Sequence, residues 1–163
     1  MNTNIEKWDV EDESFWKSTG KSVATRNLWA SIPALLLAFS VWIMWGVLVK
    51  YMKEFGFNFG MTEGLFPGTN AYNTALAEVN NLYYSLPAIA GLAGATLRLP
   101  NSFLISIGGG RNVVFITTAL LLIPAIGTGV ALSNINSPYL LFASMALLSG
   151  FGGGNFSSSM SNI

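Results

Sequence analysis

Long apolar runs alternate with polar segments along most of the chain. Each of the four longest runs reaches about 20 residues or more, the length that an α-helix needs to cross the hydrocarbon core of a bilayer. A polar segment precedes the first run, and the longest polar connection follows it. The pattern predicts an all-α membrane protein, a polytopic helical bundle. The predicted segments are a polar tail at 1–27, membrane-spanning helices at 28–52, 82–107, 112–132 and 138–160, and a link at 53–81.

Aromatic and proline residues refine this picture of the helices. Trp29 lies at one end of the first run, and Trp42, Trp45 and Tyr51 lie towards the other, a pattern typical of interfacial aromatic belts. A proline in a spanning helix frees a backbone carbonyl that neighbouring helices or water must satisfy. Prolines in the interior of these runs, at Pro33, Pro87, Pro100 and Pro124, therefore favour a tight bundle over a simple anchor.

Composition narrows the class of protein further. Of the 163 residues, 52% are hydrophobic and 10% are charged, whereas soluble domains carry about 25% charged residues. The chain contains no Cys and no His, which excludes disulfides, thiolate metal sites and imidazole ligation of haem or zinc within it. The sequence offers no nucleophile–base pair and no redox ligand, so we expect neither an enzyme nor a bound cofactor.

The distribution of basic residues sets the expected orientation. Cytoplasmic loops of membrane proteins are enriched in Lys and Arg, and the polar N-terminus lacks the pattern of a cleaved signal peptide. The tail and the turn at 108–111 hold Lys7, Lys17, Lys21, Arg26 and Arg111, whereas the other side holds Lys50 and Lys53. We therefore expect a multi-pass protein of the inner (plasma) membrane with a cytoplasmic N-terminus and an external 53–81 link.

Arg98 is the one charged residue in the apolar run 82–107. At 1.5 Å rise per residue it lies roughly 13 Å from one end of that run and roughly 24 Å from the other, inside the hydrocarbon. A lone arginine there costs about 2.5–3.5 kcal/mol on insertion scales, and no apolar segment holds an Asp or Glu to neutralise it. Two interpretations remain open. Arg98 either bonds to carbonyls freed near Pro100, or it binds an anion with its planar guanidinium.

The last apolar run contains a glycine- and serine-rich segment at 150–161 (GFGGGNFSSSMS). Small residues allow a neighbouring helix or a ligand to approach closely. Asn155 and the serines can donate hydrogen bonds to an anion, and Phe156 places a ring at the same level. The alternative for this segment is a packing face or hinge, and the alternative for the mid-run Phe39 is a core or lipid-facing position. Small residues also recur four apart at Ala90 and Gly94, Gly91 and Ala95, and Gly150 and Gly154.

Three separated segments in this order resemble the nitrate/nitrite porters of the major facilitator superfamily: Arg26–Ser40, Gly91–Arg111 and Gly150–Ile163. The acidic tail that contains tryptophan is similar as well, and the resemblance covers nearly the whole chain. It implies the N-terminal part of a twelve-helix major facilitator fold, with two pseudo-symmetric halves and a substrate site near the midplane between them.

The resemblance also implies roles for individual residues. Arg98 matches an arginine of helix two that binds the anion together with a second arginine from the other half. Phe39 and Phe156 match aromatic residues that sandwich the planar anion, and Asn155 is adjacent to them with a less defined role. The expected substrate-binding residues are therefore Arg98, Phe39, Phe156 and Asn155.

The implied function is transport of nitrate and nitrite by alternating access. The expected partners are these anions and the lipid bilayer, without nucleic acid, and the choice between proton symport and nitrate/nitrite exchange stays open. Because the chain stops after Asn155–Ile163 without a polar tail, we expect a four-helix fragment that is inactive alone. Two alternatives remain: a major facilitator transporter of another small anion, and a membrane anchor or sensor subunit that moves no solute.

Overall fold

The computed structural model describes residue 9 and residues 11–160, and every regular element in these residues is a helix. Four helical stretches are long and apolar enough to cross a membrane: Glu13–Glu54, Asn70–Gly108, Gly110–Leu132 and Tyr139–Ser157. The predicted all-α membrane protein is therefore confirmed. The elements are α1 (Glu13–Phe15), a π-helical turn η1 (Trp16–Gly20), α2 (Lys21–Glu54), α3 (Asn70–Gly108), α4 (Gly110–Leu120), α5 (Leu122–Leu132) and α6 (Tyr139–Met160).

Two spanning helices begin earlier than the hydropathy pattern predicts. α2 follows α1 and η1 without a break, so part of the predicted tail is helical. α3 begins at Asn70 instead of Leu82, because the Thr69 hydroxyl accepts a hydrogen bond from the backbone N–H of Tyr72 at 3.2 Å. Such a cap satisfies a free amide at the helix start, and the alanines that follow favour helix. Hydropathy thus locates the apolar part of a helix and misses its polar extension.

Pro124 divides the third predicted helix into α4 and α5. At Leu121 the backbone makes a tighter, 3₁₀-type hydrogen bond. The Leu121 N–H donates to the carbonyl of Thr118, three residues earlier, at 3.2 Å. A proline has no N–H, and its ring collides with the carbonyl four residues earlier, so the helix is interrupted just before it. The other prolines in the interior of the predicted runs lie inside uninterrupted α2 and α3, at Pro33, Pro87 and Pro100.

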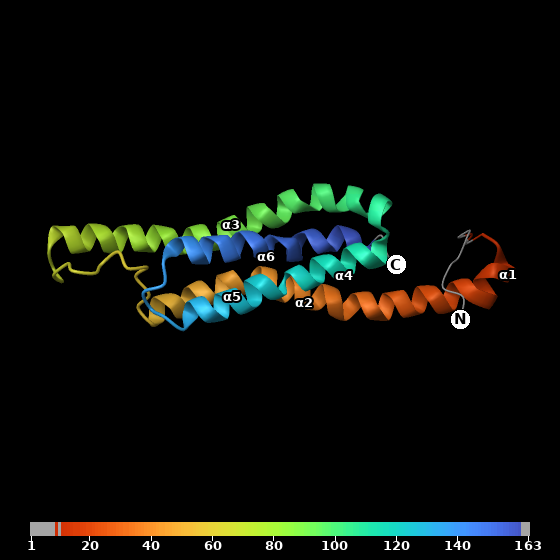
Figure 1. The fold of residues 1–163 in the computed structure, drawn as a ribbon, viewed down its shortest axis with the longest axis horizontal. Helices are drawn as coiled ribbons and strands as arrows, with labels where there is room; N and C mark the ends of the chain where they lie inside the picture. The colour runs from red at the N-terminus through yellow and green to blue at the C-terminus, as the bar shows by residue number, and fades with distance from the viewer. Residues whose placement is uncertain (1–8, 10, 161–163) are drawn as a thin grey trace.

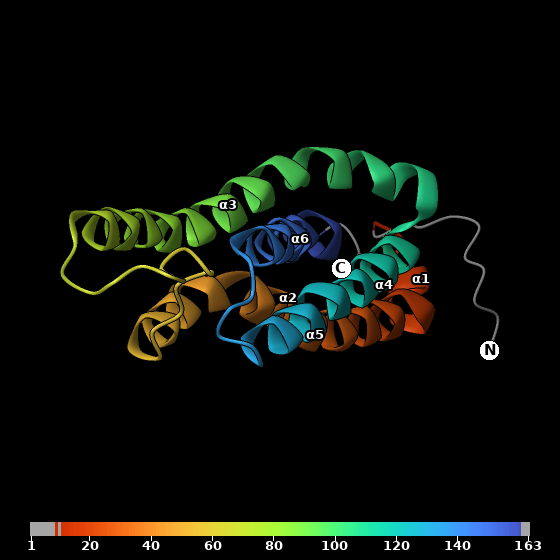
Figure 2. The same cartoon turned by 60° about the vertical axis from the view of Figure 1, so that its left-hand side comes forward.

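Helix α6 lies at the centre of the bundle and packs against α2, α3, α4 and α5 (Figures 1 and 2). Its glycines permit this closeness. A Cβ atom added to Gly150 would lie 2.8 Å from the backbone nitrogen of Gly94 in α3, and one added to Gly152 would collide with the carbonyl oxygen of Ala38 in α2. The packing interpretation of the glycine-rich segment is confirmed at these positions. Gly91 differs, because open space surrounds the place where its side chain would be.

The loop between α2 and α3 closes one end of the bundle with aromatic side chains. Phe59 is 7% exposed and packs against Tyr83 and Phe142 at centroid distances of 5.3 and 5.8 Å. The hydroxyl of Tyr83 donates to the backbone carbonyl of Phe57. Phe59 has a φ of 55°, a left-handed conformation that is unfavourable for a residue with a side chain. Burial of its ring therefore stabilises a backbone that the loop alone would not favour.

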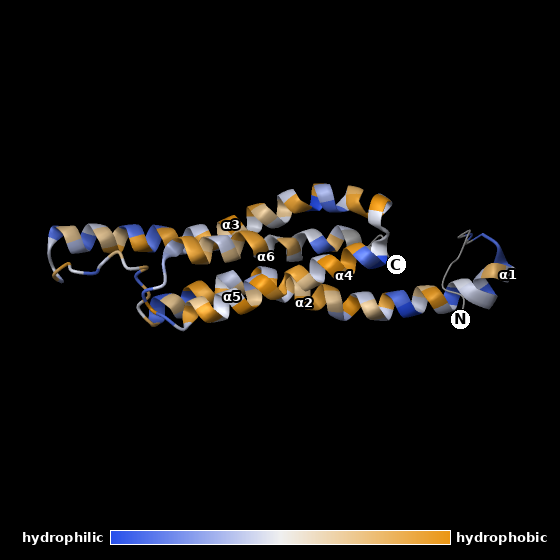
Figure 3. Cartoon of the chain, in the orientation of Figure 1, coloured by the Kyte–Doolittle hydropathy of each residue, from blue (hydrophilic) through white to orange (hydrophobic). Residues whose placement is uncertain are grey.

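The outer surface of the bundle is apolar along its middle and polar at both projecting ends. Figure 3 shows polar colours gathering on the N-terminal parts of α2 and α3, which extend beyond the other helices in opposite directions. Between these ends, large apolar side chains point outward, including Leu36 (67% exposed), Leu92 (71%) and Ile126 (64%). A continuous apolar surface of this kind fits contact with lipid or with further helices.

Candidate anion-binding site

Arg98 lies on α3 and contacts both α2 and α6. Its Nε donates a hydrogen bond to the backbone carbonyl of Gly153 in α6 at 3.2 Å. Its guanidinium carbon lies 5.7 Å from the centre of the Trp42 ring and 5.9 Å from the centre of the Phe156 ring. Both distances fall within the range of about 6 Å over which a cation is attracted to an aromatic face. The arginine is therefore held between two rings and a carbonyl.

Three aromatic side chains from two helices surround this position. The Phe39 and Phe156 rings meet edge to face, with centroids 6.2 Å apart and planes at 79°. Phe39 also meets Trp42 at 5.6 Å and 63°. Phe39 is half-buried and Phe156 is 40% exposed. The structure thus brings Arg98, Phe39 and Phe156 into one cluster, and their role in binding substrate stays a prediction.

Trp42 also joins the cluster, although the sequence pattern predicted an interfacial position for it. Its indole Nε1 donates to the carbonyl of Ala90 in α3 at 2.7 Å, which fixes the ring against α3. Trp45 is 1% exposed and donates to the Ser149 hydroxyl in α6 at 2.8 Å. The prediction that these two tryptophans belong to an interfacial belt is therefore wrong. The spacing of Trp42 three residues after Phe39, on the same helix face, was the signal that could have located it.

Glycine makes room for Trp42 beside Arg98. A Cβ atom added to Gly153 would lie 2.9 Å from Cε2 of Trp42, closer than side chains pack. Gly94 faces the same indole, since a Cβ there would lie 2.6 Å from its Nε1. The small residues of α3 and α6 therefore position the aromatic ring on which the guanidinium rests.

Asn155 has other partners. It is fully buried, its Oδ1 accepts a hydrogen bond from the Thr117 hydroxyl at 2.9 Å, and its Nδ2 donates to the Thr118 hydroxyl at 3.0 Å. These contacts join α6 to α4. They place the amide in a helix-packing role, and its predicted contact with an anion has no support in this geometry.

The guanidinium keeps most of its hydrogen-bonding capacity. Of its five N–H donors, Nε alone has a hydrogen bond to a residue that the structure describes. Within residues 9 and 11–160, no carboxylate forms an ion pair with Arg98, and its side chain is exposed. The same residues contain no group of three or more His, Cys, Asp or Glu side chains that could hold a metal. The site can therefore present a planar fork of donors, flanked by rings, to an oxyanion.

Comparison with known proteins gives this geometry a context. No protein-family model matches the chain. It is 40% identical over 159 residues to the nitrate/nitrite transporter NarU of Escherichia coli K12 and 38% identical over 159 residues to NarU of Salmonella typhimurium LT2. Each match covers 98% of this chain and 30% of the relative. It is also 35% identical over 158 residues to the probable nitrate/nitrite antiporter NarK2 of Thermus thermophilus, over 97% of this chain and 31% of that protein. This chain belongs to the nitrate/nitrite porter family.

Membership of the nitrate/nitrite porter family agrees with the helical architecture. The relatives are named as transporters or an antiporter, and none is named as an enzyme. The chain spans about a third of the length of these curated relatives. The substrates and activity of a complete nitrate/nitrite porter therefore enter as proposals for this chain.

Proposed function

We propose that this chain forms part of a transporter that carries nitrate and nitrite across the inner membrane by alternating access. The names of its relatives and its four helices of spanning length support this function. In the proposed site, Arg98 supplies the positive charge, and Phe39 and Phe156 supply aromatic walls. A second arginine from outside this chain completes the site, so that the chain alone does not transport.

The terminal nitrogens of Arg98, which form no hydrogen bond with any residue that the structure describes, carry this proposal. An arginine with a purely structural task would use them on carbonyls or polar side chains, because an unsatisfied charged donor inside a membrane is costly. Here one carbonyl, that of Gly153, engages Nε, and the rings of Trp42 and Phe156 restrict the plane of the guanidinium. Binding an anion therefore requires little ordering of the side chain, which favours affinity.

The aromatic walls supply the proposed selectivity. Nitrate and nitrite are planar, whereas sulfate and phosphate are tetrahedral. In this proposal the complete site forms a narrow slot beside Phe39 and Phe156, which accepts a flat anion in contact with the rings and excludes a tetrahedral one. Discrimination would then come from shape, with Arg98 providing the attraction common to all anions.

Counterflow measurements test the function. The transporter that carries this chain is reconstituted in proteoliposomes, and exchange of labelled nitrate and nitrite is followed with and without a pH gradient. We expect counterflow of both anions, and stimulation by the gradient would favour proton symport over exchange. Counterflow of another small anion without nitrate or nitrite would support the alternative substrate class. Absence of any anion flux in vesicles that retain the folded protein would support the anchor or sensor alternative.

A further inference from the structure

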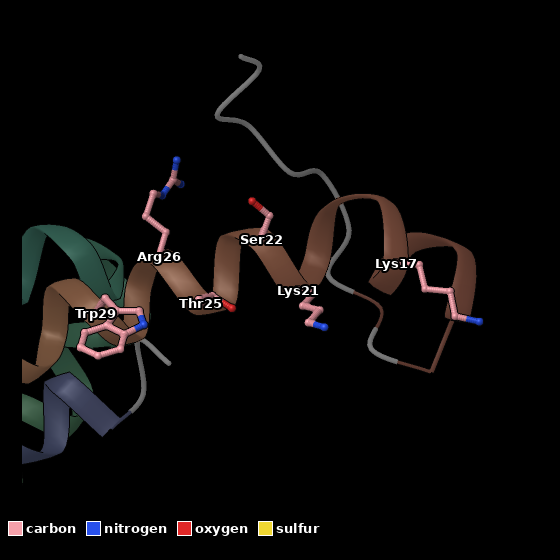
Figure 4. A pocket seen from close by; sticks show the side chains of 6 residues that line it. All are labelled: Lys17, Lys21, Ser22, Thr25, Arg26 and Trp29. Atoms are coloured by element: carbon pink, nitrogen blue, oxygen red, sulfur yellow. The ribbon is translucent and has the colours of Figure 1, made fainter.

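The N-terminal part of α2 carries a basic face that projects beyond the other helices (Figure 1). A shallow hollow of about 480 Å³ runs along this face (Figure 4). In Figure 4 Arg26 and Ser22 point to one edge of the face and Lys21 to the opposite edge, with Thr25 and Trp29 between them. The residues that line the hollow are Lys17, Lys21, Ser22, Thr25, Arg26 and Trp29.

The positive charge of this face is centred on Lys21 and Arg26. Lys17 pairs with Glu13 at 2.6 Å, so its charge is balanced locally. Lys21 and Arg26 form no ion pair with any residue in the described part of the chain. Asp12 lies beyond Glu13, and hydrogen bonds from the Ser14 hydroxyl and then from the backbone N–H groups of Phe15 and Ser14 hold its pKa below the ordinary value. The Asp12 carboxylate thus bonds within its own turn at the far end, away from Lys21 and Arg26.

The depth of this face relative to a bilayer follows from Trp29. Its ring is 68% exposed, and outward apolar side chains such as Ile32 and Leu36 follow it along α2. An exposed tryptophan at the end of an apolar run marks the boundary between hydrocarbon and headgroups. At 1.5 Å per residue, Arg26 lies about 4.5 Å and Lys21 about 12 Å beyond that boundary. With a headgroup layer of about 5–7 Å, Arg26 lies among the phosphates and Lys21 just outside them.

We propose that this face binds the phosphodiester headgroup of an anionic phospholipid. Arg26 bonds to the phosphate with its guanidinium, and the Ser22 hydroxyl on the same edge adds a donor. Trp29 packs at the level of the glycerol and ester groups. Lys21 lies within a Debye length of the headgroup layer, about 8 Å at physiological salt, and adds to the attraction for negative charge.

A lipid fits this face better than a small dissolved anion. Lys21 and Arg26 point to opposite edges, so they do not converge on one phosphate-sized ion. A bilayer offers phosphates on both edges at once, beside the apolar surface that follows Trp29. The inference is independent of nitrate transport, since none of these residues belongs to the Arg98 cluster.

Lipid retention by the intact chain tests the proposal. The chain is placed in nanodiscs of equal parts phosphatidylglycerol and phosphatidylcholine, and bound lipids are identified by native mass spectrometry. We expect retention of phosphatidylglycerol over phosphatidylcholine. The double variant Lys21→Gln/Arg26→Gln should weaken this preference by about 20- to 30-fold, because each cation near an anionic surface contributes about a fivefold gain.

A control removes an exposed cation whose charge Glu13 already balances, Lys17→Gln, and should retain the preference. Sodium chloride at about 1 M, where the Debye length is near 3 Å, should abolish the preference of the unaltered chain, a result that requires no variant to fold. An unchanged preference in the double variant or at high salt would overturn the proposal, as would an equal loss in the control. Displacement of the lipid by millimolar inorganic phosphate would point to a dissolved anion instead and would also overturn it.

Discussion

Arg98 is connected to the bundle by one backbone hydrogen bond, to Gly153, and by the faces of Trp42 and Phe156. These contacts orient the plane of the guanidinium. An oriented plane of donors is what arginine offers beyond its positive charge. A lysine at the same position would keep the charge and lose both the plane and the paired donors. Replacing Arg98 with lysine therefore distinguishes its two interpretations, as an anion ligand and as a structural arginine.

We predict that Arg98→Lys lowers nitrate uptake by the transporter that carries this chain by about tenfold or more, because a point charge cannot reproduce bidentate binding. Uptake of labelled nitrate into proteoliposomes measures the effect, with equal amounts of reconstituted protein confirmed by immunoblot. Arg111→Lys, at the start of α4 and outside the cluster, is the control and should leave uptake unchanged. Normal uptake by Arg98→Lys would assign Arg98 a structural role.

We predict that Phe156→Ala reduces discrimination between nitrate and sulfate, because the change removes one wall of the proposed slot. Inhibition of nitrate counterflow by added sulfate measures the effect and should become stronger in the variant. Phe115→Ala removes a ring that is 73% exposed on α4 and should leave inhibition as it was. If Phe156→Ala still rejects sulfate as well as the unaltered transporter does, selectivity by slot shape is refuted.

At the scale of the elements, α6 owes its central place to residues without side chains. Gly150, Gly152 and Gly153 contact α2 or α3 where a methyl group would not fit. Asn155, one turn further, bonds to threonines of α4. The same helix therefore uses close backbone contact on one side and a hydrogen-bonded amide on another, and both restrict how α6 can slide or rotate.

We predict that Gly152→Ala destabilises the bundle by about 1–3 kcal/mol, because the new methyl group collides with the Ala38 carbonyl and separates α6 from α2. Thermal unfolding of the purified chain in detergent measures the change. Gly46→Ala, in α2 with nothing within 4 Å of its Cβ position, is the control and should be neutral or stabilising, since Ala favours helix over Gly by up to about 1 kcal/mol. Equal stability of both variants would contradict the close contact between α2 and α6.

At the scale of the whole molecule, the arrangement of the helices places the start of α2 and the Gly109 turn towards one end of the bundle and the aromatic loop towards the other (Figures 1 and 2). The first end carries more basic residues than the second. We therefore propose an orientation in which the N-terminus is cytoplasmic, because cytoplasmic segments are enriched in Lys and Arg.

We predict that a membrane-impermeant maleimide applied to intact cells labels Glu63→Cys in the loop and leaves Ser22→Cys and Asn112→Cys unlabelled. The chain contains no native Cys, so each variant carries a single reactive thiol. Labelling of all three after permeabilisation is the control for thiol accessibility. The reverse pattern, with Ser22→Cys labelled from outside, would invert the proposed orientation.

Much of the fold could be predicted from the sequence because membrane helices depend on local composition. Runs of about 20 apolar residues cross a bilayer whatever surrounds them, and a lone arginine in such a run demands a partner or a ligand. The ends of the helices were harder to predict from the sequence. The start of α3 depends on the Thr69 cap, and the break before Pro124 depends on a clash between the proline ring and the preceding turn of the helix.

The sequence by itself determined the number of apolar helices, the isolated position of Arg98 within an apolar run and the family to which the chain belongs, since these depend on composition and on order along the chain. The tertiary structure decided which faces meet. It turned Trp42 from the expected interface towards Arg98, and it turned the Asn155 amide towards α4. Hydropathy assigns an apolar residue to the membrane without assigning it to lipid or to another helix. That choice depends on how closely the backbones approach, and here glycines on neighbouring helices set the distance.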